Sequence, residues 1–200
     1  MWSFNRERDA SKIESRRVIW QGPFSWPGYA AESNIDEPPD LAGVYLWTFR
    51  YRGAYLIYAA GVTNSTRKRL RSHTAEYKKG RYTVLDVSAA EKGERCEIWH
   101  GWNYAKTHQH EFVERREEIL RAVGDHLLAF RIFVTQEHDK RIRERLEAAI
   151  MQGVYCNKEP WSELADRGMY LSGRYNSEMP LLIQNYCEHK IYGLPESFEI

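Results

Sequence analysis

The chain has few cysteines and no long apolar run. Its three cysteines, Cys96, Cys156 and Cys187, lie far apart and form no Cys-x-x-Cys pair. This pattern argues against a disulfide framework or a zinc knuckle and favours a reducing compartment. The N-terminus has no apolar segment of signal-peptide length, and no later segment is long enough to cross a bilayer. We therefore expect a cytoplasmic protein without a membrane partner.

The chain also lacks an excess of charge of one sign. Its formal net charge of +1 argues, by itself, against a nucleic-acid partner. Positive charge is nevertheless concentrated between residues 50 and 81, where Glu76 is the only carboxylate and several tyrosines are interspersed. A solvated helix face is the alternative explanation of such a run. We expect a nucleic acid as the partner, contacted by basic side chains at five positions: Arg67, Lys68, Arg71, Lys78 and Lys79.

Internal repeats and low-complexity segments are absent, and 200 residues are enough to bury one substantial core. We expect one domain with extensions. Aromatic and β-branched content predicts strands over three segments: 43–49, 54–60 and 126–134, the last of them central. Apolar spacing and capping residues predict helices over five segments: 11–17, 64 or 65 to 79, 111–123, 137–152 and 181–187.

Three short motifs lie on these elements in a fixed order. Gly43-Val44-Tyr45 is on the first strand, and Tyr58-Ala59-Ala60-Gly61 ends the second. Arg69-Leu70-Arg71-Ser72-His73 is on the following helix and puts Arg69 and His73 one turn apart on one face. Further along, Glu147 lies within Arg145-Leu146-Glu147-Ala148-Ala149-Ile150, and Asn157 follows at the end of that helix.

This order of motifs resembles the GIY-YIG nuclease family over about residues 41–158. The resemblance implies an α+β fold with a GIY-YIG-like domain over 41–158, a small three-stranded antiparallel sheet flanked by helices. An N-terminal extension over 1–40 and a C-terminal extension over 159–200 would complete the chain. The implied activity is that of a metal-dependent DNA endonuclease of restriction, repair or mobile-element type. The residues that inherit catalytic positions are Tyr45, Tyr58, Arg69, His73, Glu147 and Asn157.

These residue types suit phosphodiester hydrolysis. Arg69 offers a permanently charged fork for the phosphate. Glu147 would hold Mg²⁺ or Mn²⁺, because one carboxylate with phosphate oxygens and water is a common way to bind such an ion. Tyr45 acts as a general base only if Arg69 and the metal favour its phenolate, and otherwise it positions the water. His73 accepts or relays the proton near neutral pH.

The second motif departs from the family pattern. Tyr58 lies one residue early relative to Gly61, and side chains alternate along a strand, so this shift aims Tyr58 at the opposite face unless a bulge among residues 58–61 absorbs it. Val62 stands where the family often has a lysine. The shift supports a second hypothesis, a GIY-YIG-like scaffold that binds nucleic acid with weak or no catalysis.

Two other groups of residues are weaker candidates. His100, His108 and His110 with Cys96 fit no standard zinc spacing. Trp99, Trp102 and Tyr104 are more typical of packing than of a base-stacking platform. The loop that carries them lies in an insertion between the first helix and the third strand, where a substrate contact could sit.

Overall fold

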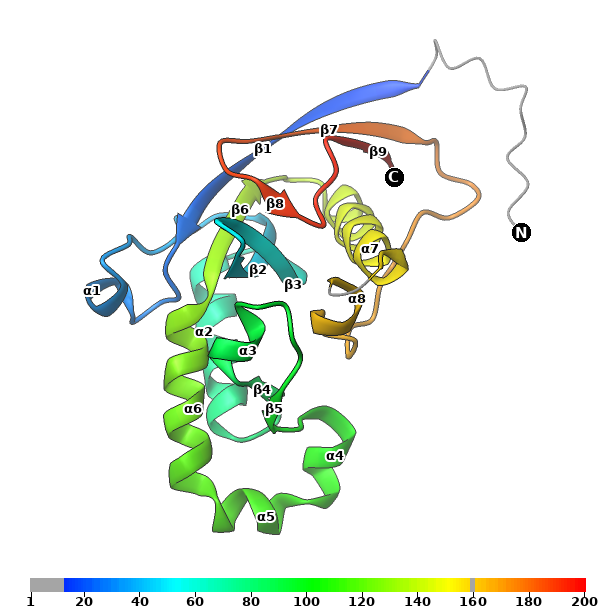
Figure 1. Ribbon diagram of the computed structural model, residues 1–200. Helices are drawn as coiled ribbons and strands as arrows, with labels where there is room; N and C mark the ends of the chain where they lie inside the picture. The colour runs from blue at the N-terminus through cyan, green and yellow to red at the C-terminus, as the bar shows by residue number, and fades with distance from the viewer. Residues whose placement is uncertain (1–12, 159–160) are drawn as a thin grey trace.

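A seven-stranded mixed sheet forms the centre of the computed structural model, which describes residues 13–158 and 161–200 (Figure 1). The strand order across the sheet is β8-β3-β2-β6-β1-β7-β9. In chain order the strands are β1 (Glu14–Phe24), β2 (Gly43–Tyr51), β3 (Ala54–Thr63), β6 (Arg131–Gln136), β7 (Leu181–Cys187), β8 (Ile191–Tyr192) and β9 (Ser197–Glu199). A separate two-stranded sheet pairs β4 (Val84–Leu85) with β5 (Glu97–Trp99).

The expected small three-stranded sheet is therefore wrong. The expected strands β3, β2 and β6 do lie side by side and antiparallel, with β6 in the middle of the sheet. Strands from both ends of the chain extend this trio, however, because β1 pairs with β6 and β7, and β8 pairs with β3. An unpaired strand edge is a site for unwanted pairing, and these additions cover both edges of the trio.

Three expected elements have a different conformation. Residues 14–17 belong to strand β1, and residues 11 and 12 of the expected helix lie outside the described residues. Residues 181–187 form β7, whose Leu181 and Ile183 are buried with the alternation of a strand. Residues 126–129 are the last turn of helix α6, because His126 and Leu127 continue the buried stripe of Ile119 and Val123. Strand β6 accordingly begins at Arg131.

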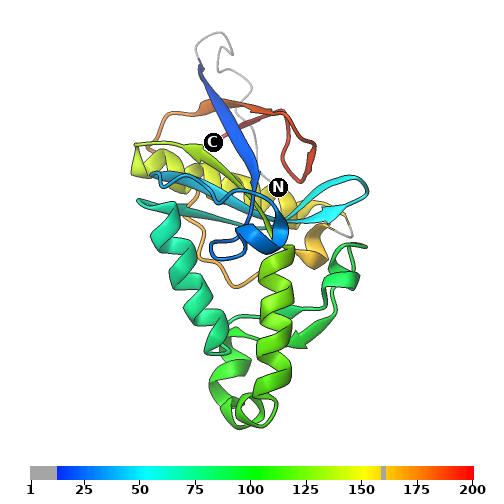
Figure 2. The same ribbon diagram turned by 90° about the vertical axis from the view of Figure 1, so that its left-hand side faces the viewer.

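Helices cover both faces of the sheet (Figures 1 and 2). Leu70 and Tyr77 of α2 and Leu127 of α6 pack on an aromatic cluster of β2 and β3, whereas α7 packs with β1 and β7 on the opposite face. The helices are α1 (Ala30–Ser33), α2 (Thr66–Lys78), α3 (Val87–Ala90), α4 (Trp102–Thr107), α5 (Gln109–Glu114), α6 (Arg116–Ala129), α7 (Lys140–Cys156) and α8 (Trp161–Leu164). No helix within residues 13–158 and 161–200 is both long and apolar enough to cross a membrane.

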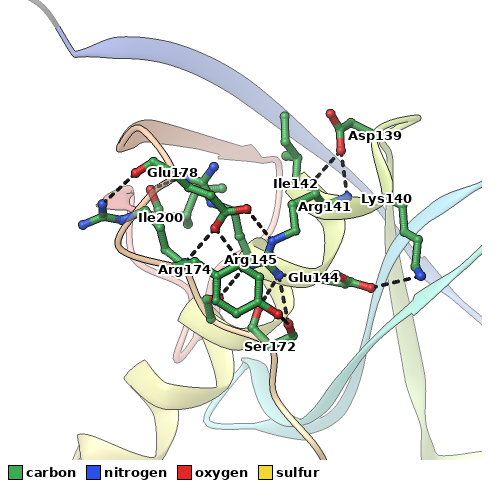
Figure 3. Close-up of polar contacts among 12 residues, drawn as sticks. Asp139, Lys140, Arg141, Ile142, Glu144, Arg145, Ser172, Arg174, Glu178 and Ile200 are labelled. Carbon is green, nitrogen blue, oxygen red and sulfur yellow. Dashed lines mark hydrogen bonds and ion pairs between the residues drawn. The ribbon is translucent and has the colours of Figure 1, made fainter.

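The C-terminal segment fixes the position of α7 (Figure 3). Arg141 donates two hydrogen bonds to the Glu178 carboxylate, at 2.6 and 2.9 Å. Arg145 is buried and donates to the carbonyl of Ile200 at 2.6 Å. Hydrogen bonds from a charged donor are roughly twice as strong as neutral ones, so these contacts hold the helix that carries Glu147.

Candidate active site

A pocket of about 320 Å³ lies where β2, β3, α2 and α7 meet. It brings together four of the six expected catalytic residues: Tyr45 from β2, Arg69 and His73 from α2, and Glu147 from α7. Ser65 begins α2 as expected, since its hydroxyl accepts a hydrogen bond from the Lys68 N–H. The helix that follows places Arg69 and His73 one turn apart on the side that faces Tyr45.

Steric constraints explain why glycine occupies positions 43 and 61 of the motifs. A Cβ atom on Gly43 would overlap the carbonyl group of Thr135 on the neighbouring strand. A Cβ atom on Gly61 would overlap the phenol of Tyr45, which lies across it from the paired position on β2. Glycine at position 43 therefore allows β6 to pack closely against β2. Glycine at position 61 allows the Tyr45 ring to lie across β3.

His73 lies between two tyrosine hydroxyls. Its Nε2 is 3.0 Å from the Tyr45 hydroxyl, and its Nδ1 is 3.1 Å from the Tyr82 hydroxyl. Burial, with the nearby Arg69 charge, lowers the pKa of His73 from 6.5 to about 3. The imidazole is therefore neutral at neutral pH and carries one N–H, so it donates to one tyrosine and accepts from the other.

Tyr45 is buried beside a guanidinium. Only 2 % of its surface is exposed, and this burial raises its pKa to about 12. The Arg69 charge opposes the rise, whereas the Glu147 charge adds to it. The free protein therefore keeps Tyr45 as a neutral phenol at neutral pH, and its hydroxyl is a hydrogen-bonding group.

Glu147 contributes a buried carboxyl group to the pocket. Burial raises the pKa of its carboxyl to about 7, Arg69 opposes this rise, and Glu144 adds to it. A bound cation would favour the ionised carboxylate. The part of the chain that the structure describes has no cluster of three or more His, Cys, Asp or Glu side chains suited to a metal. A single carboxylate such as Glu147 could hold Mg²⁺ only together with water and substrate oxygens.

Tyr58 does not reach the pocket, although the ladder does contain a bulge. Trp47 pairs with Ala59 and Thr48 pairs with Ile57, which leaves Tyr58 as the extra residue of β3. Its side chain is only 2 % exposed and packs against Phe130, with ring centroids 5.5 Å apart. A bulge among residues 58–61 is therefore present, but it leaves the Tyr58 ring in the core and outside the pocket.

Asn157 also lies away from the pocket. It caps the C-terminus of α7, and its side chain donates to the Gly153 carbonyl at 2.9 Å. Ten residues separate it from Glu147, which at 1.5 Å per helical residue is about 15 Å. Asn157 follows the Glu147 motif in the sequence, but α7 continues to Cys156 and so carries Asn157 away from the site.

The five expected DNA-contacting residues fall into two groups along α2. Arg67, Lys68 and Arg71 are exposed on its N-terminal half, near Arg69. Lys78 and Lys79 are exposed at its C-terminal end, where they line a second hollow of about 940 Å³. The two groups therefore flank the pocket at different ends of one helix.

Trp102, a weaker candidate from the sequence, also lines the pocket, and six further residues there were not expected from the sequence: Trp47, Tyr82, Asp166, Gly168, Met169 and Tyr170. Trp47 lies two residues after Tyr45, so strand alternation could have placed it on the same face. Its buried indole N–H finds no hydrogen-bond partner in the described part of the chain. Asp166 accepts from the Trp102 indole N–H at 3.2 Å, and burial raises the pKa of its carboxyl. Tertiary contacts bring it there from the C-terminal extension, and no spacing in the sequence signals this.

The chain was compared with protein-family models, curated proteins and solved structures, and none of them matches. A proposal of function therefore depends on the motif residues and on the geometry of this pocket.

Proposed function

We propose that this protein is a metal-dependent DNA endonuclease whose active site resembles that of GIY-YIG nucleases. The observation that supports this proposal is the convergence of Tyr45, Arg69, His73 and Glu147 on one pocket, from three separate elements. A phenol, a guanidinium, an imidazole and a carboxyl provide most of the groups that phosphodiester hydrolysis needs.

Arg69 and Glu147 would bind the scissile phosphate. The Arg69 guanidinium borders the pocket and offers paired donors for two phosphoryl oxygens. The carboxylate of Glu147 would hold Mg²⁺ or Mn²⁺. When bound, such an ion polarises the phosphate and stabilises the charge that develops on its oxygens. Arg69, from α2, would thus contact the phosphate directly, and Glu147, from α7, would contact it through the ion.

Tyr45 and His73 would orient the attacking water. With a pKa of about 12, Tyr45 is a poor general base at neutral pH, so we assign it a positioning role. Its hydroxyl donates to Nε2 of the neutral His73 when the other ring nitrogen donates to Tyr82. This arrangement leaves a lone pair of the Tyr45 oxygen free to accept a hydrogen bond from water.

The alternative is a module that binds DNA with weak or no catalysis. One observation favours it, because Tyr58 and Asn157 lie outside the pocket. DNA is the partner in both cases, supported by the exposed cations of α2 around Arg69. A cytoplasmic location is part of the proposal and is supported by three cysteines that form no disulfide.

A plasmid-nicking assay with Mg²⁺ tests the proposal. The variants are Glu147→Gln and Arg69→Ala, and we expect both to lose at least about 100-fold in rate. Glu117→Gln is the matched control, because Glu117 is an exposed carboxylate on α6 and does not line the pocket. The enzyme hypothesis fails if wild-type protein cuts no DNA with any divalent cation, or if Glu147→Gln cuts as fast as Glu117→Gln.

A further inference from the structure

A second hollow adjoins the proposed active site. It has a volume of about 940 Å³ and lies between the end of α2 and the insertion that carries α4, α5 and α6. Tyr82 and Trp102 line both this hollow and the active-site pocket, so the two spaces share a wall. We call it the basic groove.

The basic groove carries an excess of positive charge. Among the described residues that line it, five are cationic and one is a carboxylate: Lys78, Lys79, Arg81, Lys106, Arg116 and Glu76. Glu76 is paired with Lys79 at 3.1 Å and with Arg81 at 2.7 Å. Lys78, Lys106 and Arg116 keep their charge unopposed within the groove and come from three separate helices, which suits a ligand with several phosphates.

The wall between the groove and the pocket is held in place by several contacts. Trp102 has a left-handed backbone with φ of 55°, which is rare for a bulky residue and typically persists where the surroundings enforce it. Its backbone N–H donates to the Arg81 carbonyl at 2.8 Å, and its indole N–H donates to Asp166. Gly168 lies against one face of the indole, where a Cβ atom would overlap the ring, and Tyr82 packs against it with centroids 5.0 Å apart.

These contacts cover the ring of Trp102, so its role is to shape the wall and not to stack on a base. Phe112 also lines the groove, but it is only 6 % exposed and packs against Trp99, whereas the Tyr82 side chain is partly exposed there. A positively charged groove with aromatic side chains is typical of proteins that bind single strands. Its volume of about 940 Å³ is at the upper end of the roughly 300–1,000 Å³ of small-ligand pockets, which leaves room for a few nucleotides of one strand.

Resting on the proposed endonuclease function, we propose that the basic groove binds a single-stranded segment of DNA that continues from the scissile phosphate. The preferred substrate is then DNA with an unpaired arm next to the cleavage site, such as a flap or a branch. Fully paired DNA of the same sequence reaches the pocket without these contacts and binds more weakly.

The test is equilibrium binding by fluorescence anisotropy, in EDTA so that no cleavage occurs. The probes are a labelled duplex, the same duplex with a single-stranded DNA arm of either polarity, and the same duplex with an RNA arm. The variant is Lys106→Ala/Arg116→Ala, whose side chains are exposed on α4 and α6. The matched control is Lys92→Ala/Arg121→Ala, which removes exposed charges from residues that do not line the groove.

We expect the groove variant to bind the armed DNA about tenfold more weakly, with a salt slope reduced by about 1.4, since each lost single-strand phosphate contact lowers it by about 0.7. Binding of the plain duplex should change little, and the control should match wild type on both probes. Equal losses on both probes, or no loss on either, would overturn the inference. So would tighter binding of an RNA arm than of the DNA arm.

The inference and the proposed function fail in different ways. If wild-type protein nicks DNA but the groove variant binds armed DNA normally, the groove inference is wrong and the endonuclease stands. If the groove variant loses the armed DNA but no divalent cation supports cleavage, the catalytic proposal is wrong and the groove stands as the surface of a binding module.

Discussion

Gly61→Ala tests whether the Tyr45 phenol must lie across β3. Gly61 pairs directly with Tyr45, and the added methyl group would overlap the Tyr45 hydroxyl and ring. Gly61 has an ordinary strand backbone that alanine can also adopt. The effect of the substitution therefore comes from the steric overlap alone. Gly124→Ala is the matched control, because Gly124 lies in α6 with no atom within 4 Å of the added Cβ.

The expected magnitude follows from what Tyr45 would lose. Overpacking a core position costs about 1–3 kcal/mol. Moving the phenol also breaks its 3.0 Å contact with His73, which adds about 1 kcal/mol. We therefore expect Gly61→Ala to lower the free energy of unfolding by about 2–4 kcal/mol. Gly124→Ala should raise it by about 1 kcal/mol, because alanine favours a helix interior.

Urea unfolding followed by circular dichroism gives the stability change, and plasmid nicking gives the effect on the site. A displacement of about 1 Å at a positioning group is enough to reduce nicking about 100-fold. Combining Gly61→Ala with Tyr45→Ala removes the overlap, so the two stability changes should be clearly less than additive. Wild-type stability and wild-type nicking in Gly61→Ala would refute the geometry that we describe for Tyr45.

Two further predictions concern His126 and Tyr58. Burial lowers the pKa of His126 from 6.5 to about 3, and its Nδ1 accepts from the Leu85 N–H at 3.3 Å. The unfolded chain therefore binds the proton more tightly. As the pH falls from about 7.5 to about 5, His126 should lower the free energy of unfolding by about 2 kcal/mol. Urea titrations should show that this loss of stability is smaller in His126→Asn. The control is His110→Asn, whose imidazole is exposed and which should keep the full loss. Equal losses in the two variants would contradict the prediction. Tyr58→Phe should nick DNA at the wild-type rate and Tyr45→Phe about 100-fold more slowly, and a large loss in Tyr58→Phe would show that its hydroxyl is needed.

Local sequence signals were enough to predict the elements that carry most of the site. The Ser65 cap and the apolar spacing predicted α2, and with it the shared face of Arg69 and His73. Aromatic and β-branched content predicted strands over residues 43–49 and 54–60, which form the β2–β3 hairpin. Each of these signals lies within one segment, so no knowledge of distant contacts was needed.

Pairing between distant segments could not be predicted in the same way. Strands β1 and β7 are parallel neighbours although about 160 residues of chain separate them, and neither sequence shows which edge it will join. The run from His126 to Val134 suits both helix and strand by its apolar content. Residues 126–129 are helical because α6, which they end, packs against α2 and β4.

The position of the Tyr58 side chain also depends on distant contacts that the local sequence does not show. The sequence indicated an extra residue, but a bulged side chain can lie on either face, and contacts with Phe49 and Phe130 put it in the core. Backbone pairing continues past the bulge, so Gly61 still lies opposite Tyr45. The glycine of this motif therefore has a clear role in the pocket even though the tyrosine does not.

The active-site pocket depends on the C-terminal segment as much as on the motif residues. Asp166 donates its backbone N–H to the Tyr58 carbonyl at 2.8 Å, while its carboxylate holds Trp102. It thereby connects β3 to the insertion that forms the basic groove. Arg141 connects the helix of Glu147 to the same segment through Glu178. The groups proposed to bind the phosphate and the groove proposed to bind the adjoining strand are thus set relative to each other by residues beyond 158, outside the segment that carries the motifs.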